Sequence, residues 1–215
     1  MSAIFVTGAG TEVGKTYVTC ALIRALKQQG RAVTALKPIV SGFNHERDSD
    51  PGLILAALGE PLSPTNMARI SPFQFRAPLA PNIAARREGR EIDYADVLRL
   101  CREAIAAAPD VILIEGAGGI MSPVSDDKTF LDLIVDLNAP ALIVGGSYLG
   151  AVSHMLTAVA AARSRRVAVK AGIVSESAPP EAGLDDTMGM LQKLDPATRY
   201  DALARNGTID ARVLA

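Results

Sequence analysis

A glycine-rich segment near the start of the chain constrains the fold more than any other feature. Residues 8–16 read Gly-Ala-Gly-Thr-Glu-Val-Gly-Lys-Thr, directly after an apolar run at 3–7 and at the start of a helical pattern. A glycine-rich turn between a strand and a helix is the setting of a phosphate-binding P-loop, in which backbone N–H groups and the helix N-terminus face the anion. The sequence therefore predicts binding of a nucleoside triphosphate, with Lys15 reaching the outer phosphates and the Thr16 hydroxyl facing Mg²⁺.

The spacing of this motif departs from the strict pattern G-x-x-x-x-G-K-[ST]. That pattern would place its first glycine at position 9, where the chain has Ala9, and Gly8 comes one residue too early. The alternative interpretation is a tight turn that merely uses glycines. It leaves Gly-Lys-Thr at a helix start unexplained.

Short apolar runs alternate with longer helical patterns along the rest of the chain. This alternation predicts an α/β fold with a mainly parallel central sheet and helices on both faces. Strand-like runs occupy 3–7, 33–37, 111–115 and 141–144, with a fifth at 167–174, and helical patterns occupy 14–28, 93–107 and 149–163. The length of 215 residues predicts a single domain, 1–215.

Residues 38–81 show little of the hydrophobic periodicity of helices or strands and contain many Pro, Ser, Asn and Asp residues. The exception is a short helix expected at 53–58. A stretch of that length inside a compact domain is typical of a functional lid or binding loop. We therefore expect this segment to border the site.

The composition and charge favour a globular protein without a charged macromolecular partner. The chain is 49% hydrophobic and 21% charged, with a formal net charge of −1, so neither disorder nor nucleic-acid binding is indicated. Two short basic clusters, at 86–90 and 163–166, are expected to be solvated helix ends. With no export signal and no run of 18 apolar residues, we expect a cytoplasmic protein that does not enter a membrane. Cys20 and Cys101 are expected to be buried hydrophobes in that reducing compartment.

Two predicted strands end in charged residues, at the sheet edge where ligands of α/β proteins gather. Lys37 ends the second strand, and Glu115, followed by Gly-Ala-Gly-Gly, ends the third. Carboxylate and hydroxyl oxygens suit Mg²⁺, so Thr16, Glu115 and one further acid, Asp48 or Asp50, are the expected ligands. The alternative interpretations are a strand-end lysine whose ammonium reaches solvent and aspartates that only form turns.

These segments together resemble the dethiobiotin synthetases, the ATP-dependent carboxylases of biotin biosynthesis. The resemblance runs along most of the chain and includes the longer spacing of the phosphate loop. It also covers Lys37-Pro38 with Ser41-Gly42, Ser49-Asp50, residues 115–119, and Leu149-Gly150 with His154. It implies a P-loop NTPase fold, a ligase that uses ATP and Mg²⁺, and a homodimer.

The resemblance also implies a reaction. In it, 7,8-diaminopelargonate takes up CO2, supplied by bicarbonate, as a carbamate on one amine. The carbamate attacks the γ-phosphate of ATP, and the second amine closes a cyclic urea on the carbamic-phosphoric anhydride, giving dethiobiotin, ADP and phosphate. Because negative charge builds up on oxygen atoms, catalysis should rest on positioning and on cations.

The resemblance assigns the residues of this site. The catalytic residues are Lys37, Lys15 and Thr11. The substrate-binding residues are Glu12, Ser41, Gly118, Leu149, Gly150 and Ser153. The last three lie at a helix start that receives the carboxylate of the substrate bound in the other subunit. The nucleotide-binding residues are Glu12, Val13, Gly14, Lys15, Thr16, Tyr17, Asp50, Glu115, Gly116, Ala117, Gly118, Ser175 and Glu176. The metal ligands are Thr16, Asp50 and Glu115.

Three positions depart from the family pattern. Ser175-Glu176 stands where many members have an Asn-Asp pair that reads the base, although the following Pro179-Pro180 matches. A hydroxyl lacks the paired donor and acceptor of a carboxamide, so we expect a looser preference among nucleoside triphosphates. Ser153 replaces an asparagine, and residues 195–215 lack the expected Gly-x-x-Pro turn.

Two other classes of P-loop protein are the alternatives. Nucleotide switch ATPases of the partitioning type carry a second lysine early in the loop, where this chain has Ala9 and Gly10. The amidating synthases of corrin biosynthesis need a further glutaminase domain, for which 215 residues leave no room. A nucleotide switch would also have no need for the Lys37-Pro38 segment.

Overall fold

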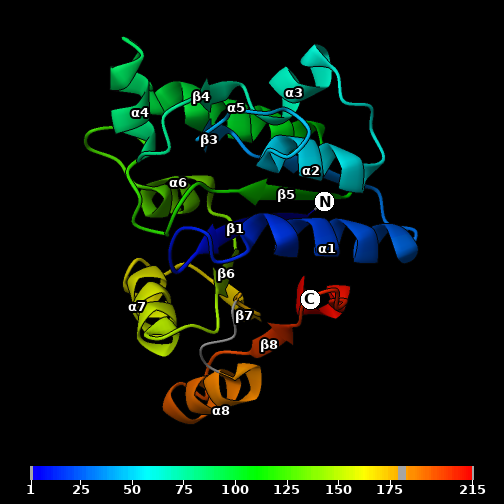
Figure 1. Ribbon diagram of the computed structural model, residues 1–215, viewed down its shortest axis with the longest axis vertical. Helices are drawn as coiled ribbons and strands as arrows, with labels where there is room; N and C mark the ends of the chain where they lie inside the picture. The colour runs from blue at the N-terminus through cyan, green and yellow to red at the C-terminus, as the bar shows by residue number, and fades with distance from the viewer. Residues whose placement is uncertain (1, 179–182, 215) are drawn as a thin grey trace.

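A sheet of six parallel strands forms the centre of the computed structural model, which describes residues 2–178 and 183–214. The strand order is β2-β5-β1-β6-β7-β8. The strands are β1 (Ser2–Gly8), β2 (Val33–Leu36), β5 (Val111–Glu115), β6 (Ala141–Gly145), β7 (Val169–Ser175) and β8 (Tyr200–Leu203). The mainly parallel sheet is therefore confirmed, with β1 at its centre (Figure 1).

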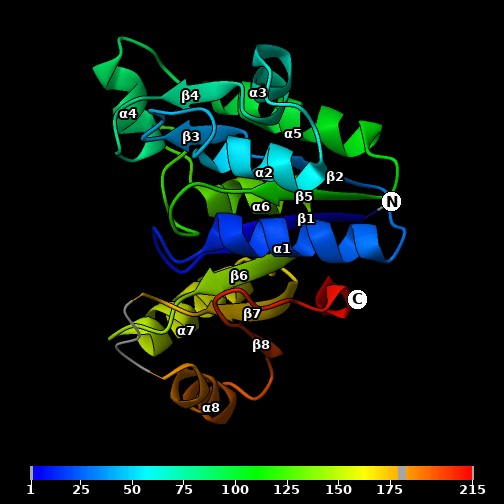
Figure 2. The ribbon, with the colours of Figure 1, turned by 45° about the vertical axis from the view of Figure 1, so that its right-hand side comes forward.

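Helices cover both faces of this sheet, because successive side chains of each buried strand point to opposite faces. In β1, Ile4 and Val6 belong to the core beneath α1 (Lys15–Gln28), which runs along the strand (Figure 2). Phe5 belongs to the core on the other face, with Val97 of α5 (Tyr94–Ala107). The helices α6 (Phe130–Leu137) and α7 (Ala151–Ser164) also contribute to the core of that second face.

The segment at 38–81, expected to be a lid or binding loop, is largely regular structure. It contains β3 (Ile39–Ser41), paired in parallel with β4 (Phe73–Phe75), and the helices α2 (Asp50–Leu58) and α3 (Pro64–Ile70), and α4 (Pro81–Arg87) follows it. The serines and prolines of this segment, which in the sequence suggest a loop, begin these helices instead. Ser49 and Ser63 are N-caps whose hydroxyls accept from the N–H groups of Gly52 and Asn66, and a proline occupies the first turn of each helix.

The last part of the chain adds elements that its pattern did not predict. These are α8 (Leu184–Leu194), the edge strand β8, and the short 3-10 helix η1 (Ala211–Leu214). The β8 strand pairs in parallel with β7, with Gly172 opposite Tyr200, and buries Leu203 completely. Pro179-Pro180 lies outside the described residues.

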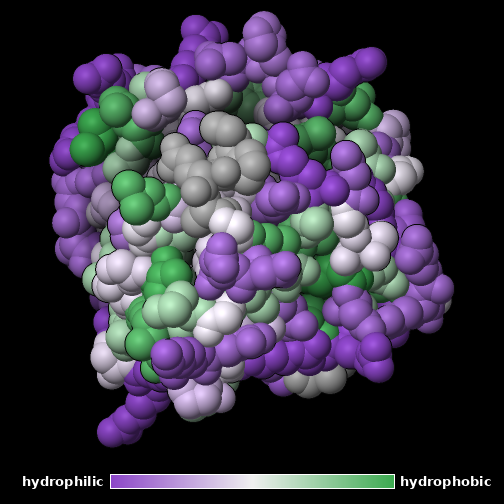
Figure 3. Space-filling model, turned by 60° about the horizontal axis from the view of Figure 1, so that its bottom comes forward, coloured by the Kyte–Doolittle hydropathy of each residue, from purple (hydrophilic) through white to green (hydrophobic). Residues whose placement is uncertain are grey.

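The basic clusters are helix ends, as expected. Arg86 and Arg87 close α4, and Arg163 lies in the last turn of α7, where it pairs with Asp195 at 2.9 Å. The end of the molecule nearest α8 mixes polar side chains with small apolar areas (Figure 3). Within the described part of the chain, none of the helices is long and apolar enough to cross a membrane.

Both cysteines are buried inside helices, as expected. Cys20 of α1 is 4% exposed and Cys101 of α5 is fully buried. Burial raises the pKa of each thiol to about 12. At neutral pH both are therefore protonated and behave as small apolar side chains.

Candidate active site

The carboxyl ends of the parallel strands gather the predicted site residues at one edge of the sheet. β1 runs into the phosphate loop, β2 into Lys37, and β5 ends in Glu115. A cavity of about 830 Å³ opens there. Its lining includes Thr11, Lys15, Lys37, Ser41, Asp50 and Gly118. The fold thus brings together side chains from the phosphate loop, from the ends of β2 and β3, and from the start of α2.

The phosphate loop explains why its glycine stands at position 8. A Cβ on Gly8 would lie 2.7 Å from the Gly10 oxygen and 3.1 Å from Lys15 Nζ, so there is no room for a side chain. Lys15 Nζ donates a hydrogen bond of 3.0 Å to the Gly10 oxygen. Gly14 precedes α1 with a φ of 90°, in the left-handed region that glycine adopts at little cost. The residues of this unusually spaced motif therefore form a closed loop that folds around the Lys15 side chain.

Lys37 joins the two predicted metal acids in the core of the site. Its Nζ lies 2.6 Å from Glu115 Oε1 and 2.8 Å from Asp50 Oδ2. The side chains of Lys37 and Glu115 are 3% and 0% exposed, so this ion pair is shielded from water. Buried charges require such partners, because an unpaired ion in the protein interior is costly. Lys37 is therefore held in the site, and the alternative of a solvated strand-end lysine is wrong.

The crowded charges shift several pKa values. Burial, and then the Lys37 ammonium, lower the pKa of Lys15 to about 8. Burial also opposes the charge on Lys37, but Glu115 and Asp50 outweigh it and raise the Lys37 pKa above its usual value. Burial opposes the charge on Asp50 as well, yet Lys37 and the Thr16 hydroxyl hold the pKa of Asp50 below its usual value. Lys37 and Asp50 are therefore both charged at neutral pH.

The three predicted metal ligands fit a magnesium ion. Thr16 Oγ1 donates to Glu115 Oε1 at 2.6 Å, and Glu115 Oε2 is buried without a hydrogen-bond partner among the described residues. An orphaned buried carboxylate oxygen beside a hydroxyl matches the hard oxygen ligands that Mg²⁺ prefers. The described residues contain no group of three or more His, Cys, Asp and Glu side chains that could hold a metal ion. The remaining ligands of such an ion would be water and phosphate.

The geometry also separates the two candidate acids of the loop. Asp50 is the first residue of α2 and reaches Lys37. Asp48 also lines the cavity, but among the described residues the carboxylates that pair with Lys37 are those of Asp50 and Glu115. The two acids lie on opposite sides of the N-cap Ser49: Asp50 belongs to the first turn of α2, whereas Asp48 precedes the helix.

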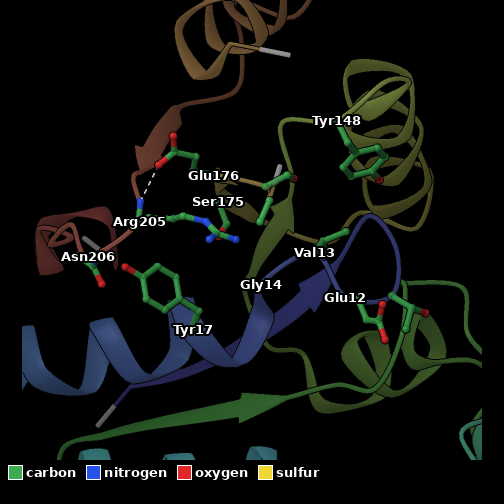
Figure 4. Close-up of a pocket in the computed structure, with 12 residues that line it drawn as sticks. Glu12, Val13, Gly14, Tyr17, Tyr148, Ser175, Glu176, Arg205 and Asn206 are labelled. Carbon is green, nitrogen blue, oxygen red and sulfur yellow. Dashed lines mark hydrogen bonds between the residues drawn. The ribbon is translucent and has the colours of Figure 1, made fainter. Parts of the chain in front are cut away.

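A second cavity, of about 680 Å³, adjoins the phosphate loop on the side of β7 and β8. Figure 4 shows Val13, Gly14 and Tyr17 on one side of it and Ser175, Glu176 and Arg205 around the other end. Tyr17 donates from its hydroxyl to the Ala204 oxygen at 3.1 Å, and a Glu176 oxygen accepts from the Arg205 N–H at 2.8 Å. The cavity continues the phosphate loop and has the position expected for a nucleoside.

The remaining predicted residues divide into two groups. Gly116 and Ala117 follow β5, where the Gly116 oxygen lies 3.5 Å from Lys37 Nζ and Ala117 lines the larger cavity. Leu149, Gly150 and Ser153 lie at the exposed start of α7 and line neither cavity, and Leu149 is 86% exposed. In one copy of the chain, the structure does not bring this group to the lysines.

Several lining residues have no motif that would have revealed them. Ser122 lines the larger cavity and accepts from the Gly119 N–H at 2.8 Å. Tyr148 lines the smaller cavity, and its hydroxyl forms a hydrogen bond of 2.9 Å with His154 Nδ1. Arg205 and Asn206 follow β8, the strand that the sequence did not predict. Arg205 and Asn206 could be assigned to the cavity only once β8 was placed beside β7.

Comparisons with known proteins show the family to which this chain is related. A protein-family profile described as an AAA domain matches residues 2–213. The chain is 50% identical over 211 residues to the ATP-dependent dethiobiotin synthetase of Phenylobacterium zucineum, covering 96% of this chain and 90% of that protein. It is 46% identical over 216 residues to the enzyme of that name from Caulobacter vibrioides, with coverage of 98% and 96%.

Among solved structures, the chain is similar to the MinC:MinD cell division protein complex of Aquifex aeolicus. The TM-score is 0.56 at 16% identity, over 95% of this chain and 81% of that chain, which shows a shared fold alone. The high identity over nearly full length to the synthetases decides the family. The chain belongs to the family of ATP-dependent dethiobiotin synthetases.

Proposed function

We propose that this protein catalyses the ATP- and Mg²⁺-dependent carboxylation and ring closure of 7,8-diaminopelargonate, giving dethiobiotin, ADP and phosphate. Membership of the family supports an ATP-dependent ligase of biotin biosynthesis. The observation that carries the finer proposal is the cavity beside the phosphate loop, in which Lys15, Lys37 and Ser41 face the same space. Two lysines and a hydroxyl suit a substrate that becomes anionic next to a triphosphate.

The nucleotide is proposed to lie along both cavities. Its phosphates bind the N–H groups of residues 12–16 and Lys15, and its nucleoside lies in the cavity lined by Tyr17, Ser175 and Glu176. The two cavities share Thr11, Glu12, Gly14 and Tyr17 in their linings. A triphosphate that spans them would direct its γ-phosphate toward Lys37.

The reaction then needs three balanced steps. One amine of the substrate adds to CO2 and loses a proton, giving a carbamate. A carbamate oxygen attacks the γ-phosphorus as ADP leaves, giving the carbamic-phosphoric anhydride. The second amine attacks the carbonyl carbon, phosphate leaves with the carbon–oxygen bonding electrons, and the amine releases its proton as the cyclic urea closes.

Each residue of the cavity has a proposed role in these steps. Lys15 and Lys37 stabilise charge on the carbamate and on the transferring phosphoryl oxygens. Thr11 and Ser41 hydrogen-bond the carbamate or the amines, and Glu12 balances the positive charge of the diamine. Gly118 lets backbone approach the substrate, since its φ of 73° and the adjacent Ser122 side chain leave no place for a Cβ.

The oxygen ligands Thr16, Asp50 and Glu115 are proposed to hold Mg²⁺ beside the phosphates. Bound there, the ion would neutralise charge on the β- and γ-phosphate oxygens. In the structure, Lys37 Nζ forms ion pairs with both carboxylates, at 2.6 Å from Glu115 and 2.8 Å from Asp50. Its ammonium is therefore close enough to the proposed metal site to reach the same phosphoryl group.

A homodimer is proposed to complete the substrate site. Leu149, Gly150 and Ser153 lie outside both cavities of one copy, while the start of α7 is exposed and can present N–H groups to a carboxylate. Mixing two inactive variants tests this arrangement. Lys37→Ala and Ser153→Asp should together recover about a quarter of wild-type activity, since half of random dimers are mixed and each has one intact site. No recovery would place Ser153 in the same subunit as Lys37.

The reaction itself is tested with labelled bicarbonate. The purified protein is incubated with 7,8-diaminopelargonate, ¹³C-bicarbonate, Mg²⁺ and ATP. Mass spectrometry should show dethiobiotin carrying the label, with one phosphate released per molecule of product. Phosphate release without the cyclic urea would leave only an ATPase and overturn the proposal.

A further inference from the structure

Ser122 lines the larger cavity beside the proposed substrate-binding residues. Its backbone is held on both sides, because its N–H donates to the Gly119 oxygen at 2.9 Å and its oxygen accepts from the Phe130 N–H at 3.0 Å. The same turn is tied to the phosphate loop, where the Ile120 N–H donates to the Gly8 oxygen at 2.7 Å. The Ser122 side chain therefore starts from a backbone that is fixed relative to the phosphate loop.

The Ser122 hydroxyl lies against Gly118, close to groups proposed to contact the carbamate. A Cβ on Gly118 would lie 2.3 Å from Ser122 Oγ and 3.6 Å from Thr11 Oγ1, so both hydroxyls lie next to this glycine. The Gly118 oxygen in turn lies near Lys15, because a Cβ on Gly8 would meet that oxygen at 3.0 Å and Lys15 Nζ at 3.1 Å. Ser122, Thr11 and Lys15 all line the larger cavity. Ser122 thus borders the space in which the carbamate is proposed to lie.

The hydrogen bonds of the Ser122 hydroxyl leave its hydrogen available. A serine hydroxyl has one donor and two acceptor lone pairs. The Gly119 N–H donates to Ser122 Oγ at 2.8 Å and so uses one lone pair. Within residues 2–178 and 183–214, no hydrogen bond takes up the hydroxyl hydrogen. An N–H that donates to a hydroxyl polarises it and strengthens the hydrogen bond that the hydroxyl itself donates, so Ser122 suits an anionic acceptor in the cavity.

We propose that Ser122 binds the carbamate form of the substrate by donating its hydroxyl hydrogen to a carbamate oxygen. The two amines of the free diamine offer no anionic oxygen, whereas the uptake of CO2 creates two oxygens that share a negative charge. A hydrogen bond to a charged acceptor is stronger than one to a neutral group. Ser122 therefore favours the carbamate, which attacks the γ-phosphate, over the free diamine. This inference rests on the proposed function and adds to it a residue that recognises the carbamate.

The test separates binding of the carbamate from binding of the diamine. Calorimetry in CO2-free buffer gives the Kd of 7,8-diaminopelargonate. Without ATP, ¹³C NMR gives the ¹³C-bicarbonate concentration at which half of the bound diamine carries the carbamate, and turnover assays give the KM for bicarbonate. The Kd of ADP and unfolding by urea report on the phosphate loop and on the fold. The variants are Ser122→Ala, which removes the donor, and Ser122→Thr, which keeps it.

In Ser122→Ala, the bicarbonate concentration for half carbamylation and the KM for bicarbonate should both rise about tenfold, a typical effect of losing a hydrogen bond to a charged group. The affinities for the diamine and for ADP, and the urea midpoint, should stay unchanged. Ser122→Thr should behave as the wild-type protein does. Ser125→Ala is the matched control, because the Ser125 hydroxyl donates to Asp127 at 2.8 Å and lines neither cavity. It should change none of these values.

Two outcomes overturn this inference while the wild-type protein still forms labelled dethiobiotin, which leaves the proposed function intact. One is a KM for bicarbonate that Ser122→Ala does not change. The other is an equal loss of affinity for the carbamate, the diamine and ADP in Ser122→Ala, which would show that Ser122 only supports the turn at Gly119. If the wild-type protein forms no labelled dethiobiotin, the proposed function is wrong, and both proposals fall.

Discussion

The ammonium of Lys37 lies 2.6 Å from Oε1 of Glu115, and both side chains are closed off from solvent. Lys37 follows β2 and Glu115 ends β5, two strands that are neighbours in the sheet. Asp50, at the start of α2, adds a second carboxylate 2.8 Å from the same nitrogen. One buried cation therefore connects the two acids proposed to hold Mg²⁺. It contributes to both the stability and the activity proposed for the protein.

Replacing Lys37 by Met should abolish activity and lower stability. The rate of dethiobiotin formation should fall at least about a hundredfold, because a preorganised positive group is lost from the site. The free energy of unfolding should fall by about 3 kcal/mol, because Glu115 is left buried without its partner. Urea unfolding and product formation by mass spectrometry measure the two effects.

The double variant Lys37→Met/Glu115→Gln separates these effects. With the buried charge on residue 115 removed as well, much of the lost stability should return, while activity stays absent. If stability does not return, the cost of Lys37→Met comes from packing of its chain rather than from the uncompensated Glu115.

Asp50→Asn should raise the Mg²⁺ concentration needed for activity, whereas Asp48→Asn should leave it nearly unchanged. Both residues line the cavity, but Asp50 is the one paired with Lys37. Removing a carboxylate ligand weakens binding of a hard cation, and we expect at least a tenfold higher half-saturating Mg²⁺ concentration, a difference of about 1.4 kcal/mol. Phosphate release across a Mg²⁺ titration provides the measurement. Equal effects of the two substitutions would contradict the assignment of Asp50.

Gly14→Ala should prevent nucleotide binding. Its Cβ would lie 2.5 Å from Ser175 Oγ at a φ of 90°, so the phosphate loop and the end of β7 must move apart. Gly30→Ala is the matched control, because Gly30 also has a positive φ, 74°, but has nothing within 4 Å of the new carbon. It should cost about 1 kcal/mol of stability and leave the affinity for ADP unchanged. Calorimetric titration with ADP distinguishes the two variants.

Asp195 should stabilise the fold in a pH-dependent way. Although partial burial opposes its charge, hydrogen bonds from Thr198, Arg163 and Tyr200 hold the pKa of Asp195 below its ordinary value of 3.8. A carboxyl with a lowered pKa contributes stability above its unfolded pKa and loses it as the pH falls through the folded pKa. Asp195→Asn should therefore cost about 2 kcal/mol at pH 7, and less below about pH 4.

Unfolding by urea at pH 7 and pH 3.5 checks this dependence. Glu91→Gln is the control, because Glu91 is an exposed carboxylate for which no ion pair is found within residues 2–178 and 183–214. It should change stability little at either pH. A constant difference between wild-type protein and Asp195→Asn across this range would contradict a charged role for Asp195.

Much of the fold was predictable from local patterns. The helices predicted at 14–28 and 93–107 are observed at Lys15–Gln28 and Tyr94–Ala107, because each has an apolar stripe and a clear end. The α6 helix was missed although Thr129 and Asp132 form a capping box ahead of its apolar run, a signal that the sequence does contain. The α2 and α3 helices were missed or shortened because Ser and Pro occur in both loops and helix starts.

The β8 strand could not be predicted in the same way. Tyr200–Leu203 is only four residues long, and its strand conformation depends on hydrogen bonds to β7. Short edge segments carry little periodicity, so their structure is decided by the neighbour that they pair with. Arg205 follows this strand, so its place in the lining of the smaller cavity depends on the same pairing.

The sequence by itself determined the phosphate loop, the parallel sheet and the identity of the charged residues at the strand ends, because these follow from local spacing and from the rule that parallel strands share a carboxyl edge. Only the tertiary structure decided that Lys37 joins Glu115 and Asp50, that Asp50 rather than Asp48 reaches it, and that Arg205 crosses the cavity toward Ser175. Contacts of this kind join residues far apart in the chain. They depend on strand order and helix packing, which local patterns do not specify.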